Sequence, residues 1–157
     1  MENKTIEIQY THYRSIEELP SEYQQLIQEA RKAKLQAYAP YSRFRVGAAV
    51  LLSDNSIIRA NNQENISYPE GLCAERVALF YASANYPDKT IKAIAIAGAS
   101  VGELTDSSIT PCGGCRQVMA EYENKQKETI KVLMTAASGE IILVDGIDKL
   151  LPFQFKM

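Results

Sequence analysis

The sequence predicts an α/β protein of three layers (α/β/α), with helices on both faces of a mixed five-stranded sheet. Apolar runs typical of buried strands alternate along the chain with helical segments, and strands separated by helices require crossover connections. The 157 residues are 46% hydrophobic and 23% charged, ordinary values for a globular domain with a substantial core. We therefore expect one domain over residues 1–157, of which residues 1–20 form an N-terminal extension.

The N-terminal part of the chain predicts a short strand and then a helix. Apolar and polar residues alternate over residues 6–10, which indicates an edge strand. His12, the one histidine of the sequence, has no motif around it, so we expect an ordinary surface residue. Ser21 and Gln24 have the spacing of a capping box. An apolar stripe at helical spacing then continues towards Pro40, where a helix must end.

A β-hairpin is expected to follow this helix. Residues 46–52 are a nearly continuous apolar run, typical of a buried strand. Residues 54–56, Asp-Asn-Ser, predict a turn, and the apolar pair at 57–58 begins a strand that returns beside the first. The polar residues 61–71, which contain proline and glycine, predict a loop.

The second half of the chain alternates between helices and strands. A helix is expected from Cys73, a central strand over residues 91–97, a loop over 99–110, and a helix from Pro111 to Tyr122. Two strands at 130–135 and 139–145 follow, and then a helical turn at 147–151. The helix that begins at Cys73 is expected to bury Val77, Ala78, Phe80, Tyr81 and Ala84.

Charge and hydropathy exclude some classes of function. The net charge is −2 without any basic run, which argues against a nucleic-acid or membrane-surface partner and favours a small polar substrate. The N-terminus has no signal-peptide pattern, and no apolar run is long enough to span a membrane. We expect a cytoplasmic protein.

The three cysteines lie in two short motifs. Cys73 precedes Glu75 by two residues, and Cys112 and Cys115 form a C-x-x-C directly after Pro111. An odd number of cysteines in a reducing cytosol favours metal binding over disulfides. Three sulfur ligands leave one zinc position open, as in catalytic sites, whereas a structural zinc fills all four. Glu75 then provides a carboxylate beside the open position without being a ligand.

Both cysteine motifs lie at expected helix starts. The free N–H groups and the partial positive charge of a helix N-terminus favour the thiolate that a metal requires. Three thiolates around Zn²⁺ leave a net charge of about −1. The two helix dipoles offset part of this charge, and Arg76 or Arg116 is expected to offset more.

The motifs C-A-E at 73–75 and P-C-x-x-C at 111–115, in this order, closely resemble those of the zinc-dependent cytidine deaminases. The resemblance extends from about residue 39 to residue 155 and includes A-P-Y-S at 39–42, V-G-A-A at 46–49 and N-Q-E-N at 62–65. It implies a cytidine deaminase-like fold. It also implies hydrolytic deamination of cytidine and 2′-deoxycytidine to the uridines, with release of ammonia, in pyrimidine salvage.

The resemblance also implies roles for the residues around the metal. One Zn²⁺ per subunit would be held by Cys73, Cys112 and Cys115 and would activate a water for attack at C4 of the base. Glu75 would take the proton of this water and deliver it to N3 and then to the departing ammonia. Arg76 would hydrogen-bond the zinc-bound thiolates.

Further residues match the family's substrate contacts. Asn62 and Glu64 would bind the ribose 3′-hydroxyl, for which an amide and a carboxylate offer a donor and an acceptor. Phe44 would pack on the pyrimidine ring, although without the resemblance it would be taken for a core residue. The backbone of Ala74 would contact the edge of the base.

The resemblance implies a homotetramer with active sites shared between subunits, because Tyr68 and Phe155 match residues that reach into neighbouring subunits. The sequence departs from the family pattern in three places. Arg45 stands where proline is common, directly after Phe44 at the expected rim of the pocket. The N-terminal extension and the loop before Pro111 are longer than usual.

Other functions compete with this interpretation. A blasticidin-type or other nucleoside deaminase of the same superfamily is the nearest alternative, and a nucleic-acid editor suits the chain less well because basic residues are not clustered. A non-catalytic zinc module has no need of Glu75, Asn62 or Glu64. A C-x-x-C redox module leaves Cys73 unexplained.

Overall fold

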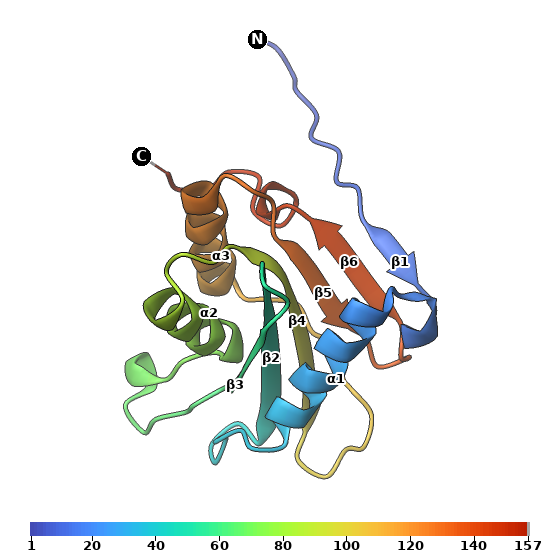
Figure 1. The fold of residues 1–157 in the computed structure, drawn as a ribbon, viewed down its shortest axis with the longest axis vertical. Helices are drawn as coiled ribbons and strands as arrows, with labels where there is room; N and C mark the ends of the chain where they lie inside the picture. The colour runs from blue at the N-terminus through green and yellow to red at the C-terminus, as the bar shows by residue number, and fades with distance from the viewer. Residues whose placement is uncertain (157) are drawn as a thin grey trace.

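A mixed sheet forms the middle layer of the structure, a computed structural model of which residues 1–156 are described (Figure 1). The six strands lie in the order β1-β6-β5-β4-β2-β3. Their bounds are β1 (Thr11–Tyr13), β2 (Phe44–Leu52), β3 (Ile57–Asn61), β4 (Ile91–Ser100), β5 (Lys131–Thr135) and β6 (Ile141–Asp145).

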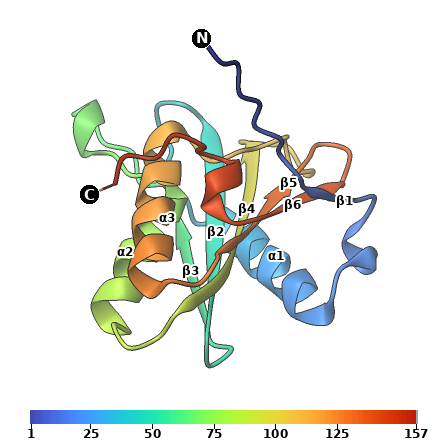
Figure 2. The ribbon, with the colours of Figure 1, turned by 90° about the horizontal axis from the view of Figure 1, so that it is seen from above.

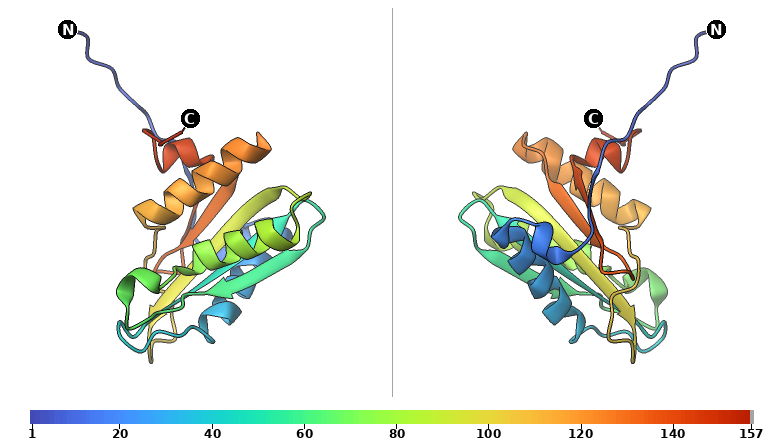
Figure 3. Two further views of the ribbon diagram at one scale, coloured as in Figure 1. Left: turned by 90° about the vertical axis from the view of Figure 1, so that its left-hand side faces the viewer. Right: turned by 90° about the vertical axis from the view of Figure 1, so that its right-hand side faces the viewer.

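Helices cover both faces of this sheet, which confirms the predicted three-layer α/β class. Helix α1 (Ser21–Lys34) lies on one face, and α2 (Ala74–Asn85) and α3 (Gly113–Gln126) lie side by side on the other (Figures 2 and 3). Three short 3₁₀ turns, η1 (Ile16–Glu18), η2 (Tyr68–Glu70) and η3 (Ile147–Lys149), complete the elements.

Strand β4 is the centre of the sheet and is buried on both faces. Ile94 and Ile96 point into the core beneath α2 and α3, whereas the alanines at 93, 95 and 97 face α1. Small residues on that side allow α1 to approach closely. A Cβ at Gly47 of β2 would lie only 2.0 Å from the carbonyl oxygen of Ala30 in α1.

The pairing of the strands explains where the two cysteine motifs meet. β2 is antiparallel to both β3 and β4, whereas β4 and β5 are parallel and are connected through α3. The hairpin turn has Asn55 at φ 67°, a conformation that asparagine tolerates better than most residues. Helices α2 and α3 pack against each other, so their N-termini can face a common site.

The edge of the sheet differs from the predicted five strands. A sixth strand, β1, pairs with β6 through Thr11 and Leu143, and it comprises residues 11–13 instead of the predicted 6–10. Residues 1–10 extend away from the body of the molecule (Figure 1). The predicted strand over residues 6–10 is wrong, because alternation along a sequence cannot show whether a neighbouring strand is within hydrogen-bonding reach.

Two local predictions about helices were wrong. The N-cap of α1 is Pro20 and no side chain caps the helix; Gln24 instead donates its side-chain amide to the carbonyl of Leu19 at 2.8 Å. In α2, Phe80 and Tyr81 are exposed, because Leu79 and its small neighbours form the side of the helix that faces the sheet. The buried residues of α2 are Ala74, Glu75, Ala78, Leu79 and Ala82.

Among residues 1–156, each helix is too short or too polar to cross a lipid bilayer.

Candidate active site

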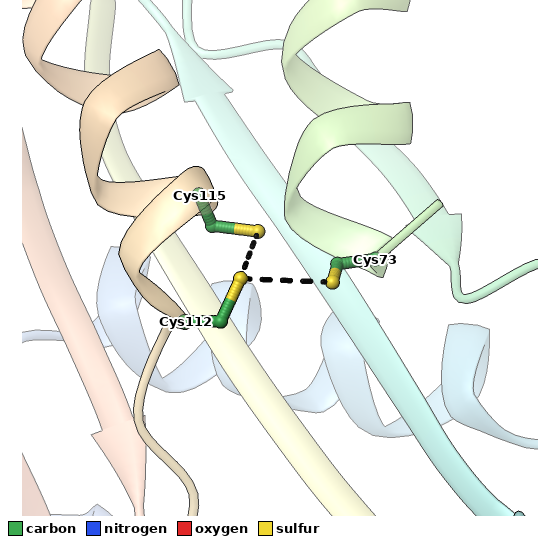
Figure 4. Close-up of side chains that lie close together, drawn as sticks. All are labelled: Cys73, Cys112 and Cys115. Carbon is green, nitrogen blue, oxygen red and sulfur yellow. Dashed lines mark hydrogen bonds between the residues drawn. The ribbon is translucent and has the colours of Figure 1, made fainter. Parts of the chain in front are cut away.

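The N-termini of α2 and α3 bring the three cysteines together (Figure 4). Cys73 is the N-cap of α2 and Cys112 the N-cap of α3, while Cys115 lies in the first turn of α3. The predicted helix starts at both motifs are therefore confirmed. Neither N-cap sulfur makes a capping hydrogen bond to its helix, so both sulfurs are free to turn towards each other.

The spacing of the sulfurs fits a zinc ion. The Sγ atoms of Cys73 and Cys112 are 3.9 Å apart, those of Cys112 and Cys115 are 3.4 Å apart, and all three lie within 4.8 Å of one another. A tetrahedral zinc with Zn–S bonds of about 2.3 Å separates its sulfurs by about 3.8 Å. Within residues 1–156 no histidine or carboxylate completes a fourth ligand of this group, which leaves the open position of a catalytic site.

The surroundings of the sulfurs favour a thiolate at Cys73. Hydrogen bonds from Cys115, from Arg76 and from Cys112 lower the pKa of the Cys73 thiol to about 5. The Arg76 guanidinium contributes through Nη2, which lies 3.7 Å from the sulfur of Cys73. The hydrogen bond with Cys73 and burial raise the pKa of the Cys115 thiol.

Glu75 lies in the first turn of α2, and only 4% of its surface is exposed. Burial raises the pKa of its carboxyl group, and the nearby charge of Cys73 raises it further. A buried carboxyl group with a raised pKa beside three sulfurs is suited to accept and return protons. The structure thus places Glu75 next to the cysteine centre, as predicted.

A cavity of about 560 Å³ opens beside the cysteine centre. Cys73 and Arg76 form its inner side, while Asn62, Glu64 and Tyr68 come from the loop between β3 and α2. Its size is that of a small-molecule site. The phenylalanines at 44 and 155, together with Glu75 and Ala74, are not among the residues that line it within this subunit.

The side chain of Asn62 is joined to the start of β2. Its Oδ1 accepts the N–H of Val46 at 2.8 Å, and its Nδ2 donates to the carbonyl of Phe44 at 3.0 Å. One N–H and one lone pair of the amide are left for another partner. Asn62 therefore has a structural function as well as any contact with a substrate.

Glu64 is joined to the loop before β2. Its carboxylate accepts the N–H groups of Tyr41 and Ser42, at 2.9 and 3.2 Å, and the hydroxyl of Ser42. Burial acts to raise the pKa of Glu64, but the hydrogen bonds from Ser42 and Tyr41 outweigh it and leave the pKa lowered. The sequence motif at residues 39–42 was noted, but its part in holding Glu64 was missed.

Phe44, Tyr68 and Phe155 occupy different positions around the site. The ring of Phe44 lies over Gly98 of β4, where an added Cβ would be 3.0 Å from ring atom Cε1. Tyr68 is 75% exposed and packs edge-on against Tyr41, with ring centroids 6.0 Å apart. The ring of Phe155 is also exposed, although both backbone polar groups of this residue are bonded to Gln117 of α3.

The two arginines of the cysteine motifs have different partners. Arg116 donates to the carbonyls of Pro111 and Leu150, at 2.8 and 2.9 Å, so it ties the C-x-x-C loop to the C-terminal segment. Arg45 donates to the carbonyl of Leu35 at 3.4 Å, at the end of α1. Arg45 thus faces α1, on the side of β2 opposite Phe44.

Comparisons with known proteins agree with this geometry. Residues 20–131 match the cytidine and deoxycytidylate deaminase zinc-binding region. A cytidine deaminase of Halalkalibacterium halodurans is 52% identical over 98 residues, which are 62% of this chain and 70% of that protein. A cytidine deaminase of Sporosarcina psychrophila is 40% identical over 132 residues, 84% of this chain and 90% of that protein. The crystal structure of the cytidine deaminase from Burkholderia pseudomallei has a TM-score of 0.70 and 40% identity, covering 83% of this chain and 97% of that one.

The fold and the cysteine centre define a zinc-dependent deaminase, an enzyme whose metal site the three sulfurs of this chain fit. The chain belongs to the cytidine and deoxycytidylate deaminase family. The resemblance drawn from the two cysteine motifs is thereby confirmed.

Proposed function

We propose that the protein catalyses the hydrolytic deamination of cytidine and 2′-deoxycytidine to uridine and 2′-deoxyuridine, with release of ammonia. The observation that carries this proposal is the buried Glu75 beside three sulfurs with one open metal position, next to a cavity bordered by Asn62 and Glu64. The relatives in Halalkalibacterium halodurans and Sporosarcina psychrophila, both cytidine deaminases, support the same substrate class.

In this proposal Cys73, Cys112 and Cys115 hold the zinc ion. Zinc bound there lowers the pKa of a water molecule and so supplies a nucleophile at neutral pH. Glu75 takes a proton from the attacking water as oxygen adds to C4 of the base, and it delivers this proton to N3. Glu75 then takes the remaining proton from the hydroxyl added at C4 and gives it to the departing amine, which leaves as ammonia while C4 becomes a carbonyl. Arg76 holds the thiolate of Cys73 by its hydrogen bond.

Other residues of this chain orient the nucleoside. The free donor of Asn62 and the free acceptor position of Glu64 bind the ribose 3′-hydroxyl. Phe44 packs against the pyrimidine ring and the backbone of Ala74 meets the edge of the base. Because the cavity beside Cys73 has room for a sugar as well as a base, a nucleoside suits it better than free cytosine.

We further propose that the enzyme is a cytoplasmic homotetramer of single-domain subunits that acts in pyrimidine salvage. The ring of Phe155 is 75% exposed in the isolated subunit, as is that of Tyr68. Exposed aromatic rings of this kind are typical of surfaces that meet another chain. In the tetramer, Tyr68 and Phe155 contribute to the site of a neighbouring subunit.

One assay of the purified enzyme tests the proposed reaction. Ultraviolet absorbance is followed with cytidine, 2′-deoxycytidine, cytosine and blasticidin S as alternative substrates. We expect turnover of both nucleosides. Turnover of blasticidin S alone would contradict the proposal and assign the enzyme to another branch of deaminases.

The variant Glu75→Gln tests the mechanism. It should keep its zinc but lose activity by at least ~10²–10⁴-fold, the contribution of a general acid–base group, because one side chain serves several proton transfers. Glu22→Gln, at an exposed position of α1, is the matched control and should be fully active. If Glu75→Gln retained a tenth of the activity, Glu75 would have no place in the mechanism.

A further inference from the structure

A buried ion cluster joins α1 to the loop that leads into the C-x-x-C motif. Asp106, only 7% exposed, accepts from Nε of Arg31 at 2.7 Å and from Nζ of Lys34 at 2.6 Å. The side chain of Lys34 is almost fully buried as well, although that of Arg31 is about one-third exposed. A carboxylate with two cationic partners at such depth fixes the position of the loop, because releasing it would leave buried charges unpaired.

The loop between Asp106 and the zinc ligand Cys112 is held at two further points. The N–H of Ser107 donates to the carbonyl of Gly98 in β4 at 2.6 Å, and the N–H of Ile109 donates to the carbonyl of Thr135 in β5 at 3.2 Å. These two bonds hold the loop against strands β4 and β5. The ion cluster of Asp106, Arg31 and Lys34 holds the same loop against α1.

Ile109 of this loop and Phe44 of β2 both lie over Gly98 of β4. A Cβ placed on Gly98 would be 2.7 Å from Cδ1 of Ile109 and 3.2 Å from Cζ of Phe44. Both side chains therefore lie over the same glycine, and both are partly buried. Because packed side chains transmit displacements, a shift of Ile109 over Gly98 would displace the ring of Phe44.

We propose that Asp106, held by Arg31 and Lys34, is a positioning residue for substrate binding, which acts through Ile109 to set the place of the Phe44 ring. The inference rests on the proposed contact of Phe44 with the pyrimidine. It also gives a function to the loop before Pro111, in which Asp106 lies.

The first test is Asp106→Asn, which removes the charge but keeps the size of the side chain. We expect KM to rise about tenfold for cytidine and by the same factor for free cytosine, because the displaced ring meets the base and not the sugar. The zinc content should be unchanged. Leu19→Ala, a buried truncation far from the loop, is the control for lost stability and should leave KM unchanged.

A double-mutant cycle with Ile109→Ala tests the route of transmission. If Asp106 acts through Ile109, the two substitutions together should raise KM no more than the larger single effect. Additive effects, or an unchanged KM in Asp106→Asn, would overturn the proposal. Should Asp106→Asn fail to fold, Arg31→Gln is used instead. It leaves the contact of Asp106 with Lys34 in place and should give a smaller rise in KM, equal for cytidine and cytosine.

Phe44→Ala separates this inference from the proposed function. If Phe44→Ala raises KM for cytosine while Asp106→Asn does not, the positioning role is wrong and the base contact stands. If Phe44→Ala leaves KM for cytosine unchanged, the base contact is wrong, and the positioning role falls with it.

Discussion

At the scale of single residues, Glu64 shows how one side chain can shape a loop and still bind a ligand. An ionised carboxylate has about four acceptor positions. Three are occupied by the backbone of Tyr41 and by the backbone and hydroxyl of Ser42. Glu64 also lines the cavity beside Cys73, and the lowered pKa of Glu64 keeps it charged at neutral pH.

Replacing Glu64 should therefore discriminate between nucleosides and the free base. In Glu64→Ala the sugar hydroxyl loses its acceptor, which costs about 1–3 kcal/mol, or roughly 5- to 150-fold in kcat/KM for cytidine. The loss with free cytosine should be much smaller, and both are measured by ultraviolet assay.

Ser42→Ala is the matched control for this prediction. It removes one bond that anchors Glu64 to the loop but leaves the carboxylate in place. It should affect cytidine and cytosine alike and only weakly. Equal losses for the two substrates in Glu64→Ala would mean that Glu64 only shapes the loop.

At the scale of elements, two helix N-termini from distant parts of the chain create the metal centre. Each supplies unpaired N–H groups and a partial positive charge towards sulfurs that carry negative charge. α2 contributes Cys73, and α3 contributes both members of the C-x-x-C pair (Figure 4). The arrangement depends on α2 and α3 lying on the same face of the sheet.

Loss of one sulfur should remove the metal and weaken the fold. In Cys112→Ala we expect most of the zinc to be lost and the melting temperature to fall, because metal binding energy also supports the folded state. Metal analysis and thermal unfolding measure the two effects.

Gly113→Ala is the control in the same loop, since a Cβ there meets nothing within 4 Å. It should retain one zinc per chain. Full zinc occupancy in Cys112→Ala would show that this cysteine is not a ligand.

The sequence predicted the elements best where the signal is local. The helix starts at Cys73 and near Pro111, the hairpin turn at Asn55 and the central strand each depend on a few neighbouring residues. It was wrong about the buried side of α2, because Phe80 and Tyr81 are hydrophobic but lie on the face that the sheet does not cover. Hydrophobicity alone does not determine which face of a helix meets its own subunit.

Within the candidate site, too, the sequence predicted what short local motifs indicate and missed what residues far apart in the chain form together. The ligand set and Glu75 follow from two short motifs, and the comparisons confirm the zinc-dependent family that these motifs indicated. The cluster of Asp106 with Arg31 and Lys34 joins residues more than 70 positions apart. No periodicity or motif in a single sequence indicates such a cluster, because only the packing of α1 against the sheet brings its residues together.

At the scale of the whole molecule, the C-terminal segment is held against its own subunit while its aromatic rings point outwards. Arg116 binds the carbonyl of Leu150, and Gln117 binds both backbone groups of Phe155. The rings of Phe153 and Phe155 are nonetheless exposed. A backbone fixed in this way presents the rings at a defined place at little further cost in conformational entropy.

If these rings complete the site of a neighbouring subunit, two inactive variants should restore activity when mixed. One variant carries Glu75→Ala, and the other lacks residues 153–157. After subunit exchange, a site with intact Glu75 can receive Phe155 from its neighbour. We expect about a quarter of the wild-type rate, because random exchange brings the two required chains together at about one site in four.

Native mass spectrometry must show that mixed oligomers have formed. The variant Phe155→Ala keeps the backbone bonds to Gln117. When it is used in place of the truncated chain, the result should be the same. If the tail acted within its own subunit, each site would lack either Glu75 or the tail, because every chain in the mixture lacks one of them. Mixed oligomers without activity would therefore place Phe155 in its own subunit and contradict the shared site. Return of activity on mixing requires that the ring of Phe155 crosses between chains, since no single chain in the mixture contains both groups.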